Sequence, residues 1–230
     1  MSGADSAPRR RPKVVSIKKG EPWGRPASGP PDREITGSDA QLAQWVATAP
    51  GALVRYRPDA SSDLARAVGL GAGEAAGTEL TMDVLELADG TLAVNMVVFG
   101  VPPDRLGRFS KRVEMRARVD DGDWFEGRTT TVVCAVGQWL RGLDLIPRGH
   151  PGDGRAEMQA YRLRPPERSR MRTRLRTGEH LPHPRILGRT GRRLEIEADA
   201  TVPIEVDGVV RTPASRLVAR VEPGAYRLLV

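Results

Sequence analysis

Residues 192–209 read RRLEIEADATVPIEVDGV. Apolar and charged residues alternate in LEIEA (194–198) and again in IEV (204–206). A period of two gives each run one apolar and one polar face, as expected of strands in a half-buried sheet. Asp207-Gly208 follows as a two-residue turn signal. The stretch predicts a β-hairpin that closes on an acidic turn, in which Asp207 is either a turn residue or a carboxylate at the edge of a site.

Further strand patterns surround this hairpin and are separated by Asp-Gly or Pro-Gly signals. The expected strands are two within residues 78–101 around Ala88-Asp89-Gly90, followed by residues 113–119, 124–136, 155–163 and 226–230. Strands at this spacing favour two packed sheets. We therefore expect an α+β protein whose residues 77–230 form a mainly antiparallel, β-sandwich-like domain.

The N-terminal part has a different composition. Residues 1–34 are rich in Pro, Gly, Arg and Ser and predict a mostly disordered basic arm, with residues 14–17 as a candidate strand. Residues 35–76 predict a small α/β unit. This unit is expected to contain a helix capped by Ser38 or Asp39, a strand over residues 52–56 and a helix over residues 62–68 that stops at Gly69.

The overall charge favours anionic partners. Lys and Arg number 36 against 29 Asp and Glu, which gives a net charge of +7. Phospholipid surfaces, phosphorylated ligands and nucleic acid all fit this excess. No apolar stretch has the length of a membrane span and the N-terminus has no signal-peptide core, so a cytoplasmic location is expected. The single cysteine, Cys134, lies in an apolar run and predicts a buried thiol.

The densest basic segment is ERSRMRTRLR, residues 167–176. Pro166 before it and Gly178 after it favour a helix. Its cations suit lipid headgroups or nucleic acid, while a solvated helix face is the alternative. The candidate headgroup residues are Arg168, Arg170, Arg172, Arg174 and Arg176.

Common catalytic and metal-binding motifs are absent from the sequence. There is no GxxxxGK[ST], CxxC, HExxH or GxSxG pattern. The three histidines, His150, His180 and His183, provide at most a pair of ligands in HLPH, so a structural role is favoured over a metal site.

Several short segments follow one another along residues 52–230: Asp63-Leu64-Ala65-Arg66, Asn95 with Gly100, Pro147 with Asp153-Gly154, Thr177-Gly178-Glu179-His180 with Pro184, Val206-Asp207-Gly208, and the closing PGAYRLLV. In this order they resemble the motifs of the bacterial diacylglycerol kinase and lipid kinase family, to which sphingosine kinases are related. The first segment resembles the family's Asn-Asp-Phe-Ala-Arg and the fifth its Asp-Gly-Glu. The resemblance implies the family's β-rich C-terminal domain, preceded here by a shortened remnant of its nucleotide domain.

The sequence departs from the family at its phosphate and acid positions. Nothing in it resembles the family's Gly-Gly-Asp-Gly-Thr loop. Asp59, Ala60, Ser61 and Ser62 stand before Asp63 where Gly-Thr-x-Asn is expected, and Val209 replaces the Glu of Asp-Gly-Glu. A carboxylate at Asp59 would repel a polyphosphate, and side chains would obstruct the close backbone approach that glycine permits. We therefore interpret residues 59–63 as a degenerate phosphate motif.

The resemblance and the charge together lead to a hypothesis with two alternatives. The first expectation is a lipid-kinase-like protein that has lost ATP-dependent phosphoryl transfer, needs no cofactor and binds a lipid or other anionic amphiphile, with peripheral association at an anionic membrane. The first alternative is an active ATP- and Mg²⁺-dependent lipid kinase, in which Asp63, Asp153 and Asp207 would hold magnesium or accept a proton. The second is a basic module that binds nucleic acid or a partner protein chain.

Overall fold

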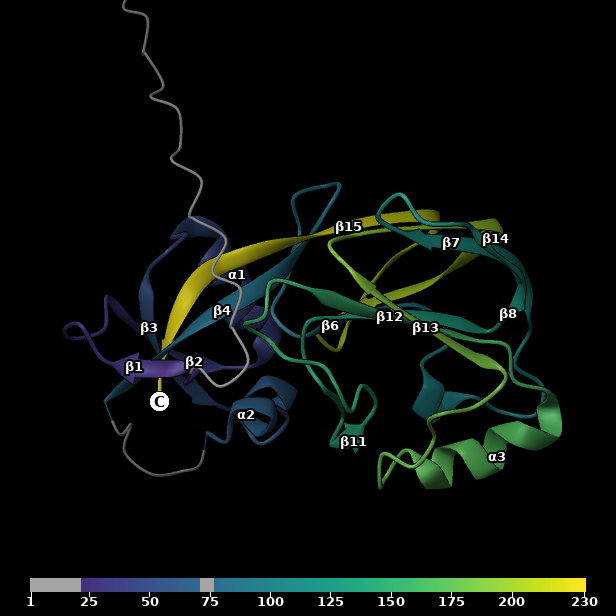
Figure 1. The fold of residues 1–230 in the computed structure, drawn as a ribbon, viewed down its shortest axis with the longest axis horizontal. Coiled ribbons are helices and arrows are strands. Elements are labelled where there is room, and N and C mark those ends of the chain that lie inside the picture. Colours follow the sequence, from purple (N-terminus) through teal and green to yellow (C-terminus); the bar gives the residue numbers. More distant parts are fainter. Residues whose placement is uncertain (1–21, 71–76) are drawn as a thin grey trace, which may run out of the picture.

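Two long antiparallel strands, β14 (Arg193–Val206) and β15 (Val209–Leu229), form the predicted hairpin. The structure is a computed structural model and describes residues 22–70 and 77–230. Val206 pairs with Val209, while Asp207 and Gly208 have positive φ angles of 45° and 81°. Positive φ at both central residues is the two-residue turn that matches strand twist. The hairpin therefore lies where the alternation and the Asp-Gly signal predict it (Figure 1).

The β-rich part is two-layered because β14 changes sheet partners along its length. Its register shifts between Glu197 and Val202 and between Val202 and Ile204. Before the shifts it pairs with β7 (Val113–Val119), which pairs with β8 (Phe125–Thr129). After them it pairs with β6 (Met96–Gly100), followed by β9 (Thr131–Ala135), β12 (Ala156–Tyr161) and β13 (Ile186–Gly191). Such irregularities let one strand serve two sheets, which gives the expected β-sandwich-like architecture.

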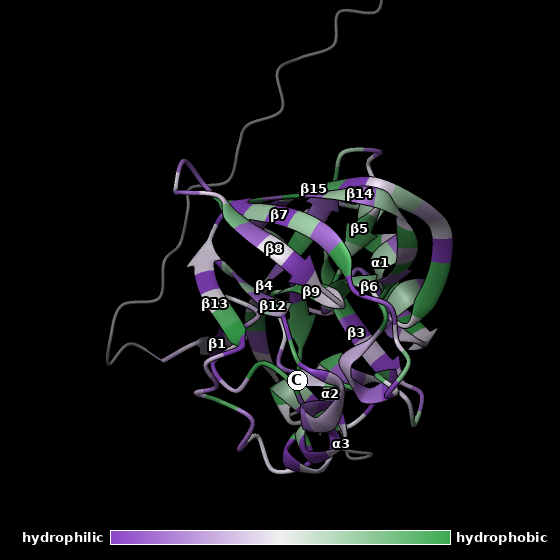
Figure 2. Cartoon of the chain, turned by 90° about the vertical axis from the view of Figure 1, so that its right-hand side faces the viewer, coloured by the Kyte–Doolittle hydropathy of each residue, from purple (hydrophilic) through white to green (hydrophobic). Residues whose placement is uncertain are grey.

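The main core joins residues of both layers, and a second core includes other residues of β6, β9 and β12. Along the strands, hydrophobic residues (green) alternate with hydrophilic ones (purple) (Figure 2). Met158 of β12 belongs to the first core and Tyr161 to the second. The second core is closed by α3 (Pro165–Arg174), which contributes Met171. Cys134 is buried, as predicted, and burial raises the pKa of its thiol to about 12.

The N-terminal α/β unit is completed by strands from elsewhere in the chain. It contains β2 (Arg33–Gly37), α1 (Asp39–Thr48), β3 (Leu53–Pro58) and α2 (Asp63–Val68). The end of β15 pairs in parallel with β3, and β3 pairs in parallel with β2. β15 also pairs with β4 (Thr78–Leu87), whose first residues pair with β1 (Gly24–Pro26). The expected boundary at residue 77 thus falls within one continuous sheet.

Local capping signals placed the two N-terminal helices. Ser38 forms a capping box with Gln41, and the Gln41 side chain accepts from the Ser38 amide at 2.8 Å. Ser62 caps α2, which ends at left-handed Gly69.

No helix in residues 22–70 and 77–230 is long and apolar enough to cross a membrane.

Several expected boundaries were wrong. Residues 22–34, expected in the disordered arm, contain β1 and the start of β2, and the Trp23 indole donates to the Thr81 carbonyl at 3.1 Å. The strand expected over residues 226–230 is the end of the much longer β15, and residues 124–136 form two strands, β8 and β9. The candidate strand at residues 14–17 lies outside the described residues. The remaining short elements are β5 (Leu92–Ala93), η1 (Pro103–Arg105), β10 (Trp139–Leu140) and β11 (Leu143–Asp144).

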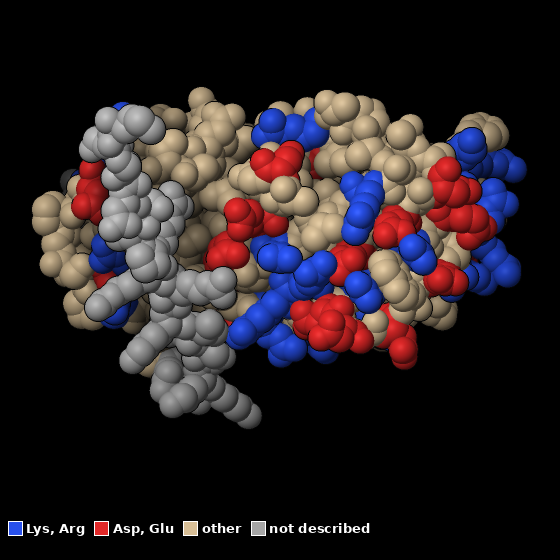
Figure 3. Space-filling model, turned by 90° about the horizontal axis from the view of Figure 1, so that it is seen from above, with Lys and Arg blue, Asp and Glu red and all other residues tan. Residues whose placement is uncertain are grey.

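The outer face of the layer that contains β7 and β14 carries charges of both signs (Figure 3). Glu195 of β14 accepts from Arg118 of β7 at 3.0 Å and from Arg193 of its own strand at 2.8 Å. Cross-strand pairs of opposite charge stabilise a sheet modestly. This face is therefore a mixed, self-neutralising surface.

Candidate functional site

Asp207 uses its carboxylate to hold the segment between β5 and β6. Oδ1 accepts the amides of Asn95 at 3.0 Å and Met96 at 2.9 Å, and Oδ2 accepts the amide of Val94 at 2.8 Å. Burial raises the pKa of Asp207 to about 7, the charge of Asp39 adds to this rise, and the three amides oppose it. The carboxylate acts as a backbone cap in this arrangement.

A second buried carboxylate, Asp39, joins the two N-terminal helices. Asp39 Oδ2 accepts the amides of Asp63 and Leu64, both at 3.0 Å, and Oδ1 accepts the Tyr56 hydroxyl at 3.0 Å and the Ser62 hydroxyl. Burial raises the pKa of Asp39, while its hydrogen bonds lower it. The first residue of α1 thereby fixes the start of α2.

Asp63 continues this chain of caps into the β-rich part. Its Oδ1 accepts the amide of Gly142 at 2.8 Å, and its Oδ2 accepts the amide of Arg141. Arg141 and Gly142 form the turn between β10 and β11 and have positive φ angles of 50° and 73°. The aspartate that matches the family's Asn-Asp-Phe-Ala-Arg motif therefore binds a turn of its own chain.

The Arg141 side chain is the cation at the centre of this region. Its Nε donates to Asp104 at 2.8 Å, its Nη2 donates to the same carboxylate at 2.6 Å, and its Nη1 donates to Glu205. Arg105 lies 3.7 Å from the other oxygen of Glu205. Burial alone would lower the pKa of Arg141, but the bonds to Asp104 and Glu205 outweigh it and the pKa is raised.

The other residues of the degenerate phosphate motif also bind within the chain. Asp59 Oδ1 accepts the Ser61 amide at 2.8 Å and the Ser61 hydroxyl at 2.6 Å. Ser62 Oγ accepts the Ala65 amide at 3.0 Å as the cap of α2. Asp59, Ser61, Ser62 and Asp63 thus all use side-chain oxygens in hydrogen bonds within the chain.

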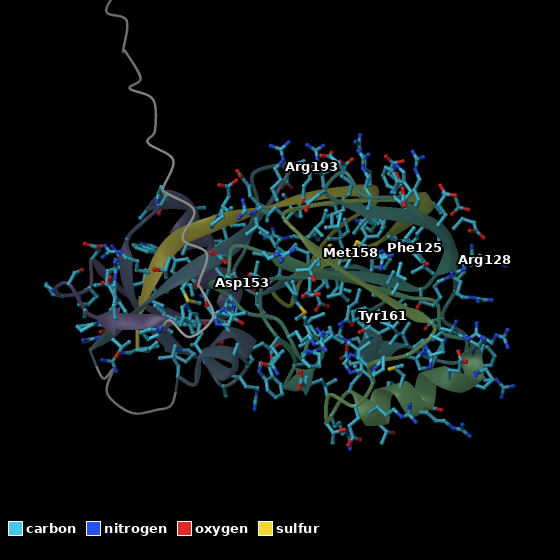
Figure 4. All side chains as sticks on the ribbon, in the orientation of Figure 1. Phe125, Arg128, Asp153, Met158, Tyr161 and Arg193 are labelled. Carbon is cyan, nitrogen blue, oxygen red and sulfur yellow. The ribbon has the colours of Figure 1, made fainter. Side chains whose placement is uncertain are left out.

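Asp153 lies in the loop before β12, at the opposite end of that strand from Tyr161 (Figure 4). Its Oδ1 accepts the Arg155 amide at 2.9 Å. The neighbouring buried acid is Asp83, which accepts the Gly154 amide at 2.6 Å and the Gly224 amide at 2.9 Å. Burial raises the pKa of Asp83 to about 6, and the charge of Asp153 contributes to the rise.

These carboxylates do not fit an ATP-Mg²⁺ centre. Magnesium takes carboxylate oxygens as ligands, and those of Asp63 and Asp207 are already the acceptors of backbone amides. Within residues 22–70 and 77–230, no three His, Cys, Asp or Glu side chains are grouped as a metal site would need.

The arginine-rich helix α3 divides the candidate headgroup residues into two kinds. Arg168 is only 2% exposed, and its Nη1 donates to the carbonyls of Gly107, Arg108 and Ser110 at 2.8, 3.0 and 2.8 Å. It does not face a lipid surface, which corrects its assignment. The exposed candidates are Arg170, Arg172, Arg174 and, just beyond the helix, Arg176.

A groove of about 360 Å³ opens between the turn after β4 and the β14–β15 hairpin. Leu87, Ile204, Val206 and Leu217 give it an apolar wall, and Asp89, Arg211 and Arg216 supply charges of both signs. Arg216 also lies 3.7 Å from Glu197. Small-molecule sites combine such walls with few polar groups. Its lining comes from the end of β4, the turn after it, β14 and β15, and none of the described residues of the N-terminal α/β unit contributes to it.

Sequence reasoning missed Asp39, Asp83 and Arg141 as members of this polar framework. Asp39 was noted only as a candidate cap. Arg141-Gly142 carries a weak turn signal, but nothing local indicates that its side chain meets Asp104 and Glu205. Arg168 had a usable signal, because residues 168, 171 and 175 share one helix face and the last two are apolar.

Comparison with known proteins was consistent with the expected family. Residues 104–230 match the family described as YegS C-terminal NAD kinase beta sandwich-like domain. Two solved structures assigned as diacylglycerol kinases from Bacillus anthracis str. Sterne have TM-scores of 0.70 and 0.67 at 12% and 14% identity. The aligned region covers 86% of this chain and 78% and 77% of theirs. At this identity the likeness shows the fold alone. No curated protein matches the sequence.

Proposed function

The chain belongs to the family of the YegS C-terminal NAD kinase beta sandwich-like domain, and we propose that it binds anionic lipid or a similar anionic amphiphile without transferring the phosphoryl group of ATP. The observation that carries the binding proposal is the exposed arginine face of α3. Arg170, Arg172, Arg174 and Arg176 are exposed, and no ion pair holds them within the described part of the chain. Clustered cations of this kind are attracted to anionic headgroups.

The engaged carboxylates support the second half of the proposal. Asp63 and Asp207 stand at family motif positions, yet each accepts two or more backbone amides. Val209, at the position of the family's glutamate, is 42% exposed and offers no acid. A general base must reach the hydroxyl proton that it removes. These residues therefore act as structural caps in the proposed function.

The groove beside the hairpin supplies a second type of contact for an amphiphile. Its apolar wall suits an acyl chain, and the guanidinium groups of Arg211 and Arg216, whose acidic neighbours are Asp89 and Glu197, suit an anionic head that competes with these acids. A long-chain fatty acid or lysophospholipid has both parts. The matched test is binding of a fluorescent fatty acid to the wild type and to Arg211→Ala/Arg216→Ala, for which we expect weaker binding; equal binding would remove the groove from the proposal.

The experiment for the α3 surface is vesicle flotation with the double variant Arg170→Glu/Arg174→Glu. We expect the wild type to float with anionic vesicles at low salt and the variant to remain in the bottom fraction, because surface attraction scales with cation number. The matched control is Arg189→Glu, a change at an exposed arginine on β13 rather than on α3. Equal flotation of all three proteins would overturn the role of α3.

Phosphoryl transfer is tested separately with labelled ATP, Mg²⁺ and diacylglycerol. We expect no turnover and no thermal stabilisation by Mg-ATP. Turnover of diacylglycerol by the wild-type chain would instead establish the kinase alternative.

A further inference from the structure

The turn between η1 and β7 presents one aromatic side chain to solvent. Phe109 is 93% exposed, far more than any other large apolar side chain among the described residues. The Ser110 amide donates to the Gly107 carbonyl at 3.2 Å, and the Gly107 amide donates to Ser110 Oγ at 2.9 Å. These two bonds close a tight turn with Phe109 near its tip. Burying such a side chain is favourable, so its full exposure calls for a reason.

The turn is held in this position by the buried arginine of α3. A single nitrogen, Arg168 Nη1, donates to the carbonyls of Gly107, Arg108 and Ser110. Hydrogen bonds from a charged donor are stronger than neutral ones. The clamp fixes the loop to the helix and leaves the Phe109 ring free in solvent.

The surroundings of the turn carry positive charge with little local compensation. Arg108 and Lys111 flank Phe109 and are exposed, as are the four arginines of α3 and its end. The nearest acids along these two parts of the chain already have partners. Asp104 of η1 pairs with Arg141, and Glu167 of α3 pairs with Arg185. Among the described residues, Arg108 and Lys111 have no ion-pair partner. An apolar tip thus stands between two exposed cations, on a turn that is bonded to the arginine-rich helix α3.

We propose that the Phe109 turn is a membrane-insertion element, which places this ring at the headgroup boundary of an anionic bilayer while the flanking cations bind the headgroups. The inference rests on the proposed lipid-surface function and names the residue that enters the interface. The charge complementarity favours an anionic lipid surface over an apolar protein partner. Arg168 is a positioning residue in this proposal, because it holds the turn and does not touch lipid.

The test compares Phe109→Ala with the wild type on vesicles of phosphatidylglycerol and phosphatidylcholine. Loss of one buried aromatic side chain predicts about tenfold weaker partitioning. Because this contribution is apolar, we expect the dependence of binding on salt to keep its slope in Phe109→Ala, whereas Arg170→Glu/Arg174→Glu flattens it. Val210→Ala is the matched control, since Val210 is 69% exposed and lies outside the cationic turn.

A second variant reports insertion directly. Phe109→Trp keeps an interfacial aromatic group, so it should retain vesicle binding, and its added indole emission should be quenched by lipids brominated along the acyl chain. Phe109→Ala that binds like the wild type, or an added emission in Phe109→Trp that brominated lipid leaves unchanged, would overturn the insertion proposal while the lipid-surface function stands. Failure of the wild type to bind either vesicle would overturn the proposed function itself.

Discussion

Asp207 provides the sharpest test of whether the acidic turn is structural. In Asp207→Ala, three amides lose their acceptor at about 1 kcal/mol each, and alanine in the left-handed conformation costs about 1 kcal/mol more, so unfolding should become easier by about 4 kcal/mol. Asp207→Asn keeps one acceptor oxygen and tolerates a positive φ, but it turns an NH₂ group toward the Val94 amide. We expect it to lose about 1–2 kcal/mol at pH 5.

The pH dependence of this difference follows from the raised pKa. Burial raises the pKa of Asp207 from 3.8 to about 7, so the native state holds this proton through a range in which the unfolded state has released it. The native state then binds more protons, and stability falls as pH rises from about 4 to about 7. Between pH 5 and 8 the wild type should lose about 3 kcal/mol through this group, a loss that Asp207→Asn lacks.

The assay is urea unfolding followed by tryptophan fluorescence at pH 5, 6.5 and 8. The matched control is Asp199→Asn, an exposed acid on the same strand, which should stay within about 0.5 kcal/mol of the wild type. An Asp207→Ala protein as stable as the wild type would refute the capping role. An Asp207→Asn curve parallel to the wild type across this pH range would refute the raised pKa.

Three further variants test the framework around this turn. Arg141→Ala leaves the buried carboxylate of Glu205 without its nearest cation and should lower the free energy of unfolding by about 3 kcal/mol in urea; a loss below about 1 kcal/mol would contradict the network. Tyr56→Phe removes the hydroxyl that donates to Asp39 and should cost about 1 kcal/mol, seen as a lower Tm; an unchanged Tm would show that the bond contributes nothing. Burial raises the pKa of Asp83 to about 6, so the native state of the wild type should lose stability as the pH rises from about 4 to 6. Between pH 4.5 and 6.5 the Tm of Asp83→Asn should therefore fall less than that of the wild type. An equal fall in both proteins would contradict the raised pKa.

Local signals explain which elements the sequence could predict. The β14–β15 turn follows from period-two alternation and Asp-Gly, and α2 follows from Ser62 before it and Gly69 after it. Each signal acts over a few residues. These elements could therefore be placed without knowledge of the rest of the chain.

The length of β15 could not be predicted because its interruptions are absorbed by the sheet. Pro213 and Pro223-Gly224 resemble strand ends, yet β15 runs through both. Its pairing with β4 shifts register between Glu222 and Tyr226, and its pairing with β14 shifts near Ala214. Proline is accepted in strands at such irregularities. Whether a proline ends a strand thus depended on partners far away in sequence.

The roles of the acids depended on distant partners in the same way. The amides bound by Asp207 precede it by more than 100 residues, and those bound by Asp63 belong to Arg141 and Gly142. The sequence showed that acids were present and that Val209 stands where the family has a glutamate. Only the fold shows that the remaining carboxylates hold backbone.

The central claim is tested most directly by flotation of the wild-type chain with phosphatidylglycerol-containing vesicles and with pure phosphatidylcholine vesicles, each at low and high salt. The account predicts recovery with the anionic vesicles at low salt, a marked loss at high salt as the exposed arginines are screened, and little recovery with the neutral vesicles. Equal recovery with both lipids at low salt, or recovery with neither, would contradict it.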